Sequence, residues 1–356
     1  MAADRDTKLK IVAAGVLAPS ADNSQPWKFS LSDRGVLIGA DPARIGMFFD
    51  SALAATQMSL GAVCENMLLE AGRLNLGAQL RPLPAEPGQT LPTYALDLTD
   101  DPADRDPLAD HIPARMTHRG LYRRRAMPDR EALAAIAAAL PDPLGCRLDW
   151  ATGKDARQGL QRAVYLADLV RFTHPTIHRD FHDKLRFGHQ AAATRDGLDA
   201  ATLGIERLLL PILRLLRPWP LAKTLNGVGL KHIMAWRGGW LPMASAPALG
   251  VLTARTDVGY FDMGRALERV WLAATRAGLA FQPLGALPLL LVRATRMGGE
   301  GLSGEHRHLL EQADQAWRQA VPHLPRGEQL VMIFRTGHAM ALAPHSQRRP
   351  QASFLA

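Results

Sequence analysis

Three polar side chains stand close together near the start of the sequence, on Ser20, Asn23 and Gln25. A helix-like pattern runs up to this stretch and ends at Pro19, and the residues after Pro26 resemble a strand. The stretch is therefore predicted to be a tight loop between a helix and a strand. Its short polar side chains would suit a flat polar ligand. Spacing alone favours the alternative, a capping turn in which these side chains bond only the backbone.

A second stretch places Arg115, Thr117 and Arg119 at alternate positions of a predicted turn. Two guanidinium groups and one hydroxyl can hold a dianionic phosphate through charge-assisted hydrogen bonds. The alternative is a basic loop that faces solvent, which is how we interpret the neighbouring arginines at 123–125. Taken alone the pattern is weak, and it gains weight from the presence of the first loop.

Three histidines, His174, His178 and His182, follow one another at four-residue intervals. On a helix they would share one face, as metal ligands do. The competing interpretation is structural, because Pro175 suits the first turn of a helix and leaves His174 near the cap. No carboxylate-bearing zinc motif accompanies the histidines, and we therefore predict no metal site.

The composition is that of a folded globular protein. The chain has 356 residues, 47% of them hydrophobic, a formal net charge of +8 and two cysteines, Cys64 and Cys146. Two cysteines cannot form a disulfide framework, and neither a signal core nor a span-length apolar run occurs. We therefore expect a cytoplasmic protein without stable membrane insertion. The scattered arginines argue against nucleic-acid binding and favour small anionic ligands.

Periodicity and turn residues indicate the elements that must position these groups. Helices are predicted over 5–18, 51–76, 130–140, 154–172, 261–279 and 303–321. Strands are predicted over 27–31, 36–40, 79–81, 94–98, 247–253 and 329–334. Residues 100–107 have the composition of a linker, and the tail from residue 336 is expected to be irregular. Residues 203–245 are apolar with spaced cations.

Two of the predicted helices resemble each other. An offset of 203 residues (268 − 65) places Glu65 on Glu268 and Gly61 on Gly264. The same offset matches Leu69, Ala71, Arg73 and Leu76 to Leu272, Ala274, Arg276 and Leu279. Both helices end in a Gly or Asn turn and lead into a strand-like segment. We interpret this as an internal repeat.

The first loop resembles the Pro-Ser-x-x-Asn-x-Gln-Pro-Trp signature of the FMN-dependent nitroreductase family, with matches from Pro19 to Trp27. The second stretch resembles the Arg-x-Ser/Thr-x-Arg/Lys element with which ordinary nitroreductases begin. Each element is present once, the loop in the first half of the chain and the basic element in the second. This arrangement is similar to the fused, single-flavin subgroup, which includes the mycobacterial Acg-like proteins. The resemblance is weakest between about 150 and 245.

The resemblance implies an α+β, nitroreductase-like fold in which two fused halves form an intramolecular pseudo-dimer. Residues 1–105 would form the first half and residues 106–356 the second. A helical lid-like insertion is expected at about 203–241, with core packing or a membrane-surface face as alternatives for that segment. The protein is expected to function as a monomeric pseudo-dimer, and further oligomerisation is left open.

The resemblance also implies the cofactor FMN and its contacts. The flavin ring would lie along the first loop, at Pro19, Ser20, Ala21 and Asn23, with Gln25 in support. The phosphate end would be held by Arg115, Thr117 and Arg119, joined by Arg348 or Arg349. A third contact is expected from Pro283, Leu284 and Gly285, with the backbone near Gly285 facing flavin N5.

The implied function is an NAD(P)H-dependent flavin oxidoreductase that acts on small molecules. Hydride would pass from NAD(P)H through flavin N5 to an electron-poor acceptor such as a nitroaromatic or a quinone. The chemistry is centred on the flavin, and no catalytic side chain is assigned. The alternative is an FMN-binding storage or sequestering protein whose flavin lies under the lid. Both functions use the same binding residues, and access to N5 separates them.

Overall fold

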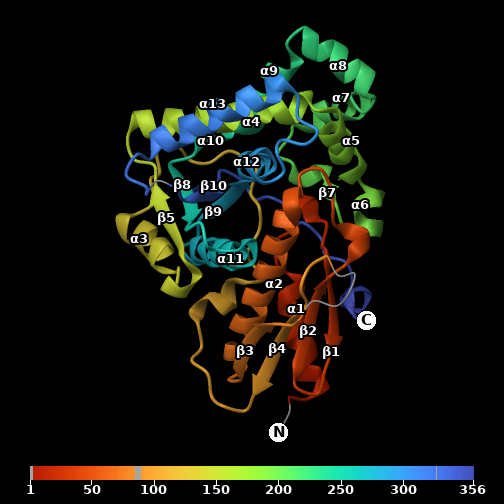
Figure 1. The fold of residues 1–356 in the computed structure, drawn as a ribbon, viewed down its shortest axis with the longest axis vertical. Coiled ribbons are helices and arrows are strands. Elements are labelled where there is room, and N and C mark those ends of the chain that lie inside the picture. Colours follow the sequence, from red (N-terminus) through yellow and green to blue (C-terminus); the bar gives the residue numbers. More distant parts are fainter. Residues whose placement is uncertain (1–2, 85–89, 326) are drawn as a thin grey trace.

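The computed structural model describes residues 3–84, 90–325 and 327–356, and it is an α+β protein built around two four-stranded antiparallel sheets (Figure 1). The helices α2 (Ala54–Arg73) and α11 (Tyr260–Arg276) pack against each other between the sheets (Figure 1). Helices α4 (Lys154–Thr173) and α13 (Gly304–Ala320) lie across the far side of the second sheet (Figure 1). Within the described ranges, none of the helices combines the length and the apolar character needed to cross a membrane.

The first sheet has the order β1-β2-β4-β3 and belongs to the first hundred residues. Its strands are β1 (Trp27–Leu31), β2 (Gly35–Ala40), β3 (Gly77–Pro82) and β4 (Tyr94–Thr99). Helices α1 (Arg5–Val16) and α2 (Ala54–Arg73) pack on it. Helix α2 ends three residues before the predicted end, because Asn75 takes a left-handed φ of 58° and Gly77 already pairs with Thr99.

The second sheet has the order β5-β8-β10-β9. Its strands are β5 (Cys146–Trp150), β8 (Ala248–Ala254), β9 (Ala280–Leu284) and β10 (Gln329–Gly337). Helices packed around it are α3 (Arg130–Ala138), α11 (Tyr260–Arg276), α12 (Ala286–Arg296) and α13 (Gly304–Ala320). All seven residues of β8 are buried, which explains why its sequence is a continuous apolar run instead of an alternating one. Strand β10 extends three residues beyond the predicted strand.

The two sheets share one topology. Each is built from two strands, a long helix and two further strands, and in each the last strand lies between the second and the third. The second sheet differs by two insertions. One joins β9 to β10 through α12 and α13, and the larger one fills residues 151–247 between β5 and β8. The predicted insertion at 203–241 is therefore only the last part of a longer one.

The larger insertion is helical. It contains α4 (Lys154–Thr173), α5 (Pro175–Lys184), α6 (His189–Thr194), α7 (Leu210–Leu215), α8 (Trp219–Gly227), α9 (Leu230–Ala235) and α10 (Leu241–Ser245). A short parallel pair, β6 (Leu185–Arg186) and β7 (Leu198–Asp199), links the two ends of the α6 region. Helices α7, α8 and α9 protrude at the end of the molecule opposite the first sheet (Figure 1).

The crossing of α2 and α11 is made possible by two glycines at equivalent positions of the repeat. A Cβ atom on Gly61 would lie 1.9 Å from the carbonyl oxygen of Phe261, and one on Gly264 would lie 2.0 Å from that of Met58. The same offset of 203 relates Met58 to Phe261 (261 − 58) and Gly61 to Gly264 (264 − 61). The contact is thus reciprocal, as at an interface with twofold symmetry.

Exchange of either glycine for alanine is expected to lower the free energy of unfolding by about 1–3 kcal/mol, because the helices must move apart to admit the methyl group. The double variant Gly61→Ala/Gly264→Ala should lose less free energy of unfolding than the sum of the two single losses. The first methyl group already moves the helices apart and so makes room for the second. Urea unfolding measures both effects. Gly304→Ala is the control, because no atom lies within 4 Å of its Cβ position. Additive losses would contradict a shared crossing.

The C-terminal residues return to the first sheet. Phe354 is fully buried against Trp27 and Phe29, at ring-centroid distances of 6.1 and 6.4 Å. Ala356 donates its backbone N–H to the carbonyl of Phe29, at 2.9 Å. We call residues 345–356 the C-terminal strap. The tail from residue 338 is otherwise irregular, as predicted, apart from a short 3-10 turn at Gln351–Phe354.

Candidate functional site

A cavity of about 310 Å³ lies where the two sheets and their helices meet. Its walls come from the first loop, α2, the basic turn at 115–119, α4, α5, α11, the start of α12 and the C-terminal strap. Apolar side chains line much of it, among them Met58, Leu267, Trp271, Leu284, Val331 and Met332. A concave, mainly apolar surface with a few convergent charges is the usual form of a cofactor site.

The first loop borders the cavity in a strained conformation. Its residues Asp22, Asn23 and Gln25 have φ angles of 49°, 53° and 51°, a left-handed region that L-residues seldom adopt. The Ser20 hydroxyl closes the loop by accepting the backbone N–H of Gln25, at 2.9 Å. This is the capping bond expected from spacing alone. Strain of this kind persists only where the surroundings fix the backbone, and it concentrates at functional sites.

The second half of the chain supplies what fixes this loop. The buried Gln25 amide donates from Nε2 to the carbonyl of Arg195, at 2.8 Å, and its Oε1 accepts the backbone N–H of Arg349, at 2.9 Å. The Asn23 amide donates to the carbonyl of Gln347, at 3.0 Å, and accepts from Arg348 at 2.8 Å. Every side-chain oxygen and nitrogen of these two amides therefore serves to hold the loop.

Arg348 also caps α1. Its guanidinium donates to the backbone carbonyls of Val16, Leu17 and Ala18, at 3.1, 3.3 and 2.9 Å. These carbonyls lie at the negative end of the helix, where a cation is stabilising. Burial lowers the pKa of Arg348 to about 9. The side chain thus borders the cavity as a positive charge held in place by the backbone it caps.

The basic turn runs beside β9. His118 donates its backbone N–H to the carbonyl of Phe281, at 2.9 Å. The fully buried Arg335 on β10 donates to the carbonyl of Gly120, at 2.6 Å, and thereby fixes the end of the turn. Arg119 faces the cavity and donates to the carbonyl of Thr202, at 3.2 Å. Thr117 borders the cavity next to it.

Arg115, the third member of the predicted phosphate element, already has an ion-pair partner and other contacts within the protein. Its Nε lies 3.1 Å from Oε1 of Glu268, its guanidinium lies 4.5 Å from the centroid of the Trp271 ring, and it donates to the carbonyl of Leu17 at 2.6 Å. Both members of the ion pair are buried. Burial raises the pKa of Glu268 to about 7, an effect that Arg115 opposes. Arg115 borders the cavity with most of its charge balanced by this partner.

Acidic side chains border the cavity as well, on Asp22, Asp168 and Asp180. Asp168 on α4 is 3% exposed and lies 3.6 Å from Nη1 of Arg171, one turn further along the helix. Burial raises the pKa of Asp168 from 3.8 to about 6, and Arg171 opposes this shift. Burial also raises the pKa of Asp22, with Arg171 and Arg119 opposing. Side chains of both charges therefore border the cavity near the first loop, and the same is true on α4.

The raised pKa of Asp168 predicts a pH-dependent stability. The folded protein binds this proton more tightly than the unfolded chain, so the stabilisation is complete below about pH 4 and is lost as the pH rises toward 6. Asp168→Asn should remove this loss and gain up to about 3 kcal/mol over the parent at pH 7. Thermal or urea unfolding between pH 4 and 7 measures it, with the exposed Asp33→Asn as control. Equal pH slopes for Asp168→Asn and parent would contradict the assignment.

The start of α12, which follows β9 directly, forms another part of the cavity wall, beside the first loop and the basic turn. Pro283, Leu284, Gly285 and Ala286 border the cavity. The first N–H groups of a helix have no partner within the helix and form its positive end. No helix was predicted at α12, because Pro288 falls inside its first turn and interrupts the helical pattern there.

Eleven of the thirteen predicted cofactor residues border this cavity. They are Pro19, Ser20, Ala21, Asn23, Arg115, Thr117, Arg119, Pro283, Leu284, Gly285 and Arg348. Gln25 and Arg349 lie behind the loop and hold it from there. Sequence reasoning missed Asp168, Arg171 and Trp271. The spacing of Asp168 and Arg171 at i and i+3 was the available signal, and nothing local pointed to Trp271.

The histidines of α5 take structural roles. His174 caps the helix by accepting the backbone N–H of Ile177, as predicted, and its Nε2 contacts the carbonyl of Gly301 at 2.9 Å. His178 contacts the carbonyl of Arg217 at 3.0 Å. Among the described residues no three His, Cys, Asp or Glu side chains are arranged to hold a metal ion.

No protein-family model matches this sequence. The uncharacterized protein MT1398 of Mycobacterium tuberculosis (strain CDC 1551 / Oshkosh) is 25% identical over 350 residues, which are 95% of this chain and 47% of the relative. The chain thus spans about half the length of that curated relative.

Two solved structures illustrate the similarity in fold. A nitroreductase with bound FMN from Desulfitobacterium hafniense DCB-2 is 18% identical, with a TM-score of 0.36, over 70% of this chain and 96% of its own. The FMN-dependent nitroreductase NfnB from Mycobacterium smegmatis, in complex with NADPH, is 18% identical, with a TM-score of 0.38, over 69% and 96%. These similarities are distant and concern the fold alone.

Proposed function

We propose that this protein is an FMN-binding oxidoreductase of the nitroreductase type, which passes hydride from NAD(P)H to an electron-poor acceptor. One observation carries the proposal. Three separate stretches chosen from the sequence, at 19–23, 115–119 and 283–285, meet on a single cavity although up to 266 positions separate them (285 − 19). Unrelated surface loops have no reason to converge in this way.

The residues present fit FMN. A flavin ring needs an apolar contact surface, and Leu267, Leu284 and Met332 border the cavity beside the strained first loop. A phosphate needs cations that are not neutralised, and Arg119 and Arg348 border the cavity with only carbonyl or amide oxygens as hydrogen-bond acceptors. Arg115 fits this role less well than its position in the sequence suggested, because Glu268 takes its charge.

When bound, FMN supplies the two-electron chemistry. The protein's part is to bind, orient and exclude water. The start of α12 would direct backbone N–H groups from Gly285 and Ala286 toward the reacting edge of the ring, and Arg119 and Arg348 would favour a negative charge on the flavin. No side chain is proposed as general acid or base.

We further propose that the two halves form an intramolecular pseudo-dimer with one flavin site, divided near residues 105 and 106. The shared order of the two sheets and the reciprocal glycine contact of α2 and α11 support this proposal. A symmetric dimer would have two such sites. Here the first loop has no counterpart before β5, and the second site is lost.

Flavin content and reduction test the proposal together. The full chain, reconstituted with FMN and freed of excess, should carry one FMN per chain, measured by absorbance after release. Anaerobic NADPH or NADH should then bleach the visible absorption band of the flavin. A ratio near zero overturns the whole proposal, and a ratio near two overturns the single-site argument.

Retention of FMN without reduction by either nucleotide would instead favour storage. For that function the cover of the cavity matters. Among the residues of the predicted lid, Leu203 and Gly238 border the cavity, together with Ile177 and Phe181 of α5. We therefore propose that α5 and the segment leading to Leu203 form the cover, while α7 to α9 extend away from the cavity.

A further inference from the structure

The helices α7 to α9 expose an unusual amount of apolar surface. Twelve large apolar side chains are exposed among the described residues, and eight of them lie between 208 and 236. They are Leu208, Leu209, Ile212, Leu215, Leu221, Val228, Ile233 and Trp236, with exposed fractions from 36% for Leu221 to 89% for Leu208. We call residues 208–236 the α7–α9 protrusion. Clustering of this kind marks an interaction surface.

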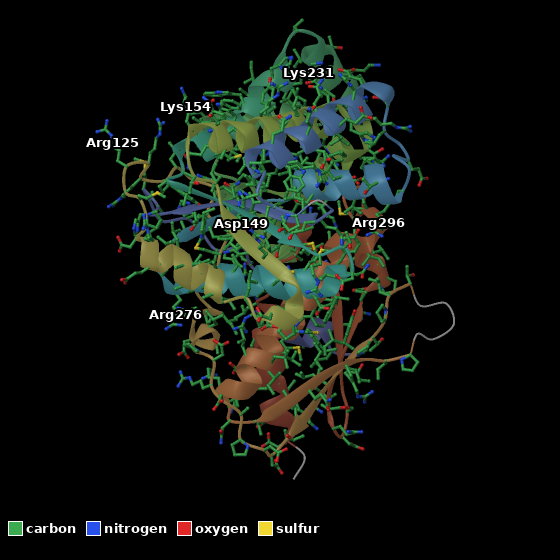
Figure 2. The ribbon with its side chains drawn as sticks, turned by 60° about the vertical axis from the view of Figure 1, so that its left-hand side comes forward. Arg125, Asp149, Lys154, Lys231, Arg276 and Arg296 are labelled. Atoms are coloured by element: carbon green, nitrogen blue, oxygen red, sulfur yellow. The ribbon has the colours of Figure 1, made fainter. Side chains whose placement is uncertain are left out.

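The same segment is strongly basic. No Asp or Glu occurs in the fifty residues between Glu206 and Asp257, whereas Arg214, Arg217 and Lys223 are exposed on the protrusion. Lys231 of α9 lies in the upper part of Figure 2 and pairs with Glu305 of α13, at 3.8 Å. Cations among exposed Leu, Ile, Val and Trp residues are typical of helices that lie in the interface of an anionic membrane.

The apolar side chains are held outward by a fixed inner face. Leu213, Leu216, Ala222 and Ala235 are buried. The Asn226 amide donates to the carbonyl of Phe172 on α4, at 2.8 Å. Together with the contact of His178 to the backbone of Arg217, this bond ties the protrusion to α4 and α5. The exposed side chains are therefore fixed on the outer face of the protrusion.

We propose that the α7–α9 protrusion docks on the surface of a membrane rich in anionic lipids. Charge complementarity favours an anionic membrane over a second copy of this protein. A second copy of the protrusion would bring cations against cations, which is unfavourable, whereas lipid phosphates neutralise them and the acyl boundary accepts the leucines. The helices α7, α8 and α9 have 6, 9 and 6 residues, too few to span a bilayer, so they would lie along its surface. The proposal does not depend on the flavin chemistry.

Vesicle co-sedimentation of the full chain tests this proposal. With vesicles of phosphatidylcholine and phosphatidylglycerol in equal parts, the protein should bind at least about tenfold more tightly than with phosphatidylcholine alone. Raising the salt from about 0.05 to 0.5 M should weaken the binding, because the charges are exposed and screened. Equal binding to both vesicle types, or no binding to either, overturns the proposal.

Two variants assign the binding to the protrusion. The first exchanges Leu208, Leu215, Val228 and Ile233 for serine, and the second exchanges Arg214, Arg217 and Lys223 for glutamine. Each should reduce binding to the anionic vesicles at least about tenfold. All seven positions are at or near the surface, and circular dichroism checks that the fold is kept.

The matched controls change equal numbers of residues elsewhere. One exchanges the exposed Leu121, Met127, Met340 and Leu342 for serine, and the other exchanges Arg123, Arg124 and Arg125 for glutamine. Figure 2 shows Arg125 on a loop well away from Lys231. The controls should bind as the parent does, and equal losses overturn the assignment. Sedimentation velocity without lipid tests whether two copies associate through the protrusion. A dimer of the parent protein that is absent in the protrusion variants would overturn the proposal in favour of self-association.

Discussion

Exchange of Arg119 and Arg348 for alanine is expected to abolish the preference of the protein for FMN over riboflavin. Arg119 borders the cavity and would contribute one charge-assisted bond to the phosphate, worth about 1.5–3 kcal/mol. The N–H groups of Arg348 already bond protein oxygens, so this side chain would add its positive charge near the phosphate. Loss of both should weaken FMN binding by a factor of at least about 10 to 10². Riboflavin, which has no phosphate, should lose far less. Fluorescence titration of the two flavins measures both affinities.

The comparison of the two flavins separates a phosphate contact from a structural role. Arg348 also caps α1 and bonds Asn23, so its loss disturbs the first loop and would weaken FMN and riboflavin alike. Only a change in the ratio of the two affinities reports on the phosphate. Arg123→Ala/Arg124→Ala is the control, because both side chains are exposed. An unchanged ratio in the Arg119/Arg348 variant would move the phosphate site elsewhere.

Glu268→Leu is expected to lower the free energy of unfolding by about 3–5 kcal/mol, since it leaves the guanidinium of Arg115 buried without a counter-charge. The side chains of this pair are 3% and 0% exposed. Adding Arg115→Met to the same variant should restore most of the stability, because an apolar pair of similar volume has no charge to desolvate. Urea unfolding of the single and double variants measures the difference.

The repeat provides a matched control for this experiment. Glu65 is the counterpart of Glu268 at the offset of 203, and it is equally buried. Its partners Arg265 and Arg269, at 2.9 and 2.7 Å, are 24% and 16% exposed and keep other acceptors, including Asp262 and Asp106. Glu65→Leu should therefore cost less than Glu268→Leu. If Glu65→Leu lowered the free energy of unfolding as much as Glu268→Leu, burial of Arg115 would not be the reason why loss of its ion pair is destabilising.

Local signals carried much of the prediction from sequence. Pro19 and Pro26 bounded the first loop, and periodicity identified the long helices, because these features act within a few residues. The repeat was visible because Gly61 and Gly264 both sit where backbones touch, so only glycine is accepted at either place. Convergence of the three stretches on one cavity could be expected only through the resemblance, since no local pattern states which segments meet.

Contacts between distant residues set the limits of that prediction. The sequence around Arg115 resembles a phosphate element, yet its charge is taken by Glu268, 153 positions later (268 − 115). The large insertion was placed at 203–241, whereas the structure inserts 151–247, because α4 shares a buried core with the second sheet and its sequence pattern resembles that of any core helix. The partners that Gln25 uses to support the first loop, the backbone groups of Arg195 and Arg349, were equally invisible.

The C-terminal strap has a consequence for the order of assembly during synthesis. The first loop leaves the ribosome early, yet the residues that hold Asn23 and Gln25 in their left-handed conformation lie more than 300 positions later, at 347–349. Phe354 must also arrive before the core around Trp27 and Phe29 is complete. Contacts of such sequence separation form late in folding. A nascent chain therefore carries the first loop without its final shape until residues 347–349 have been made, and a cofactor can enter a finished cavity only after that.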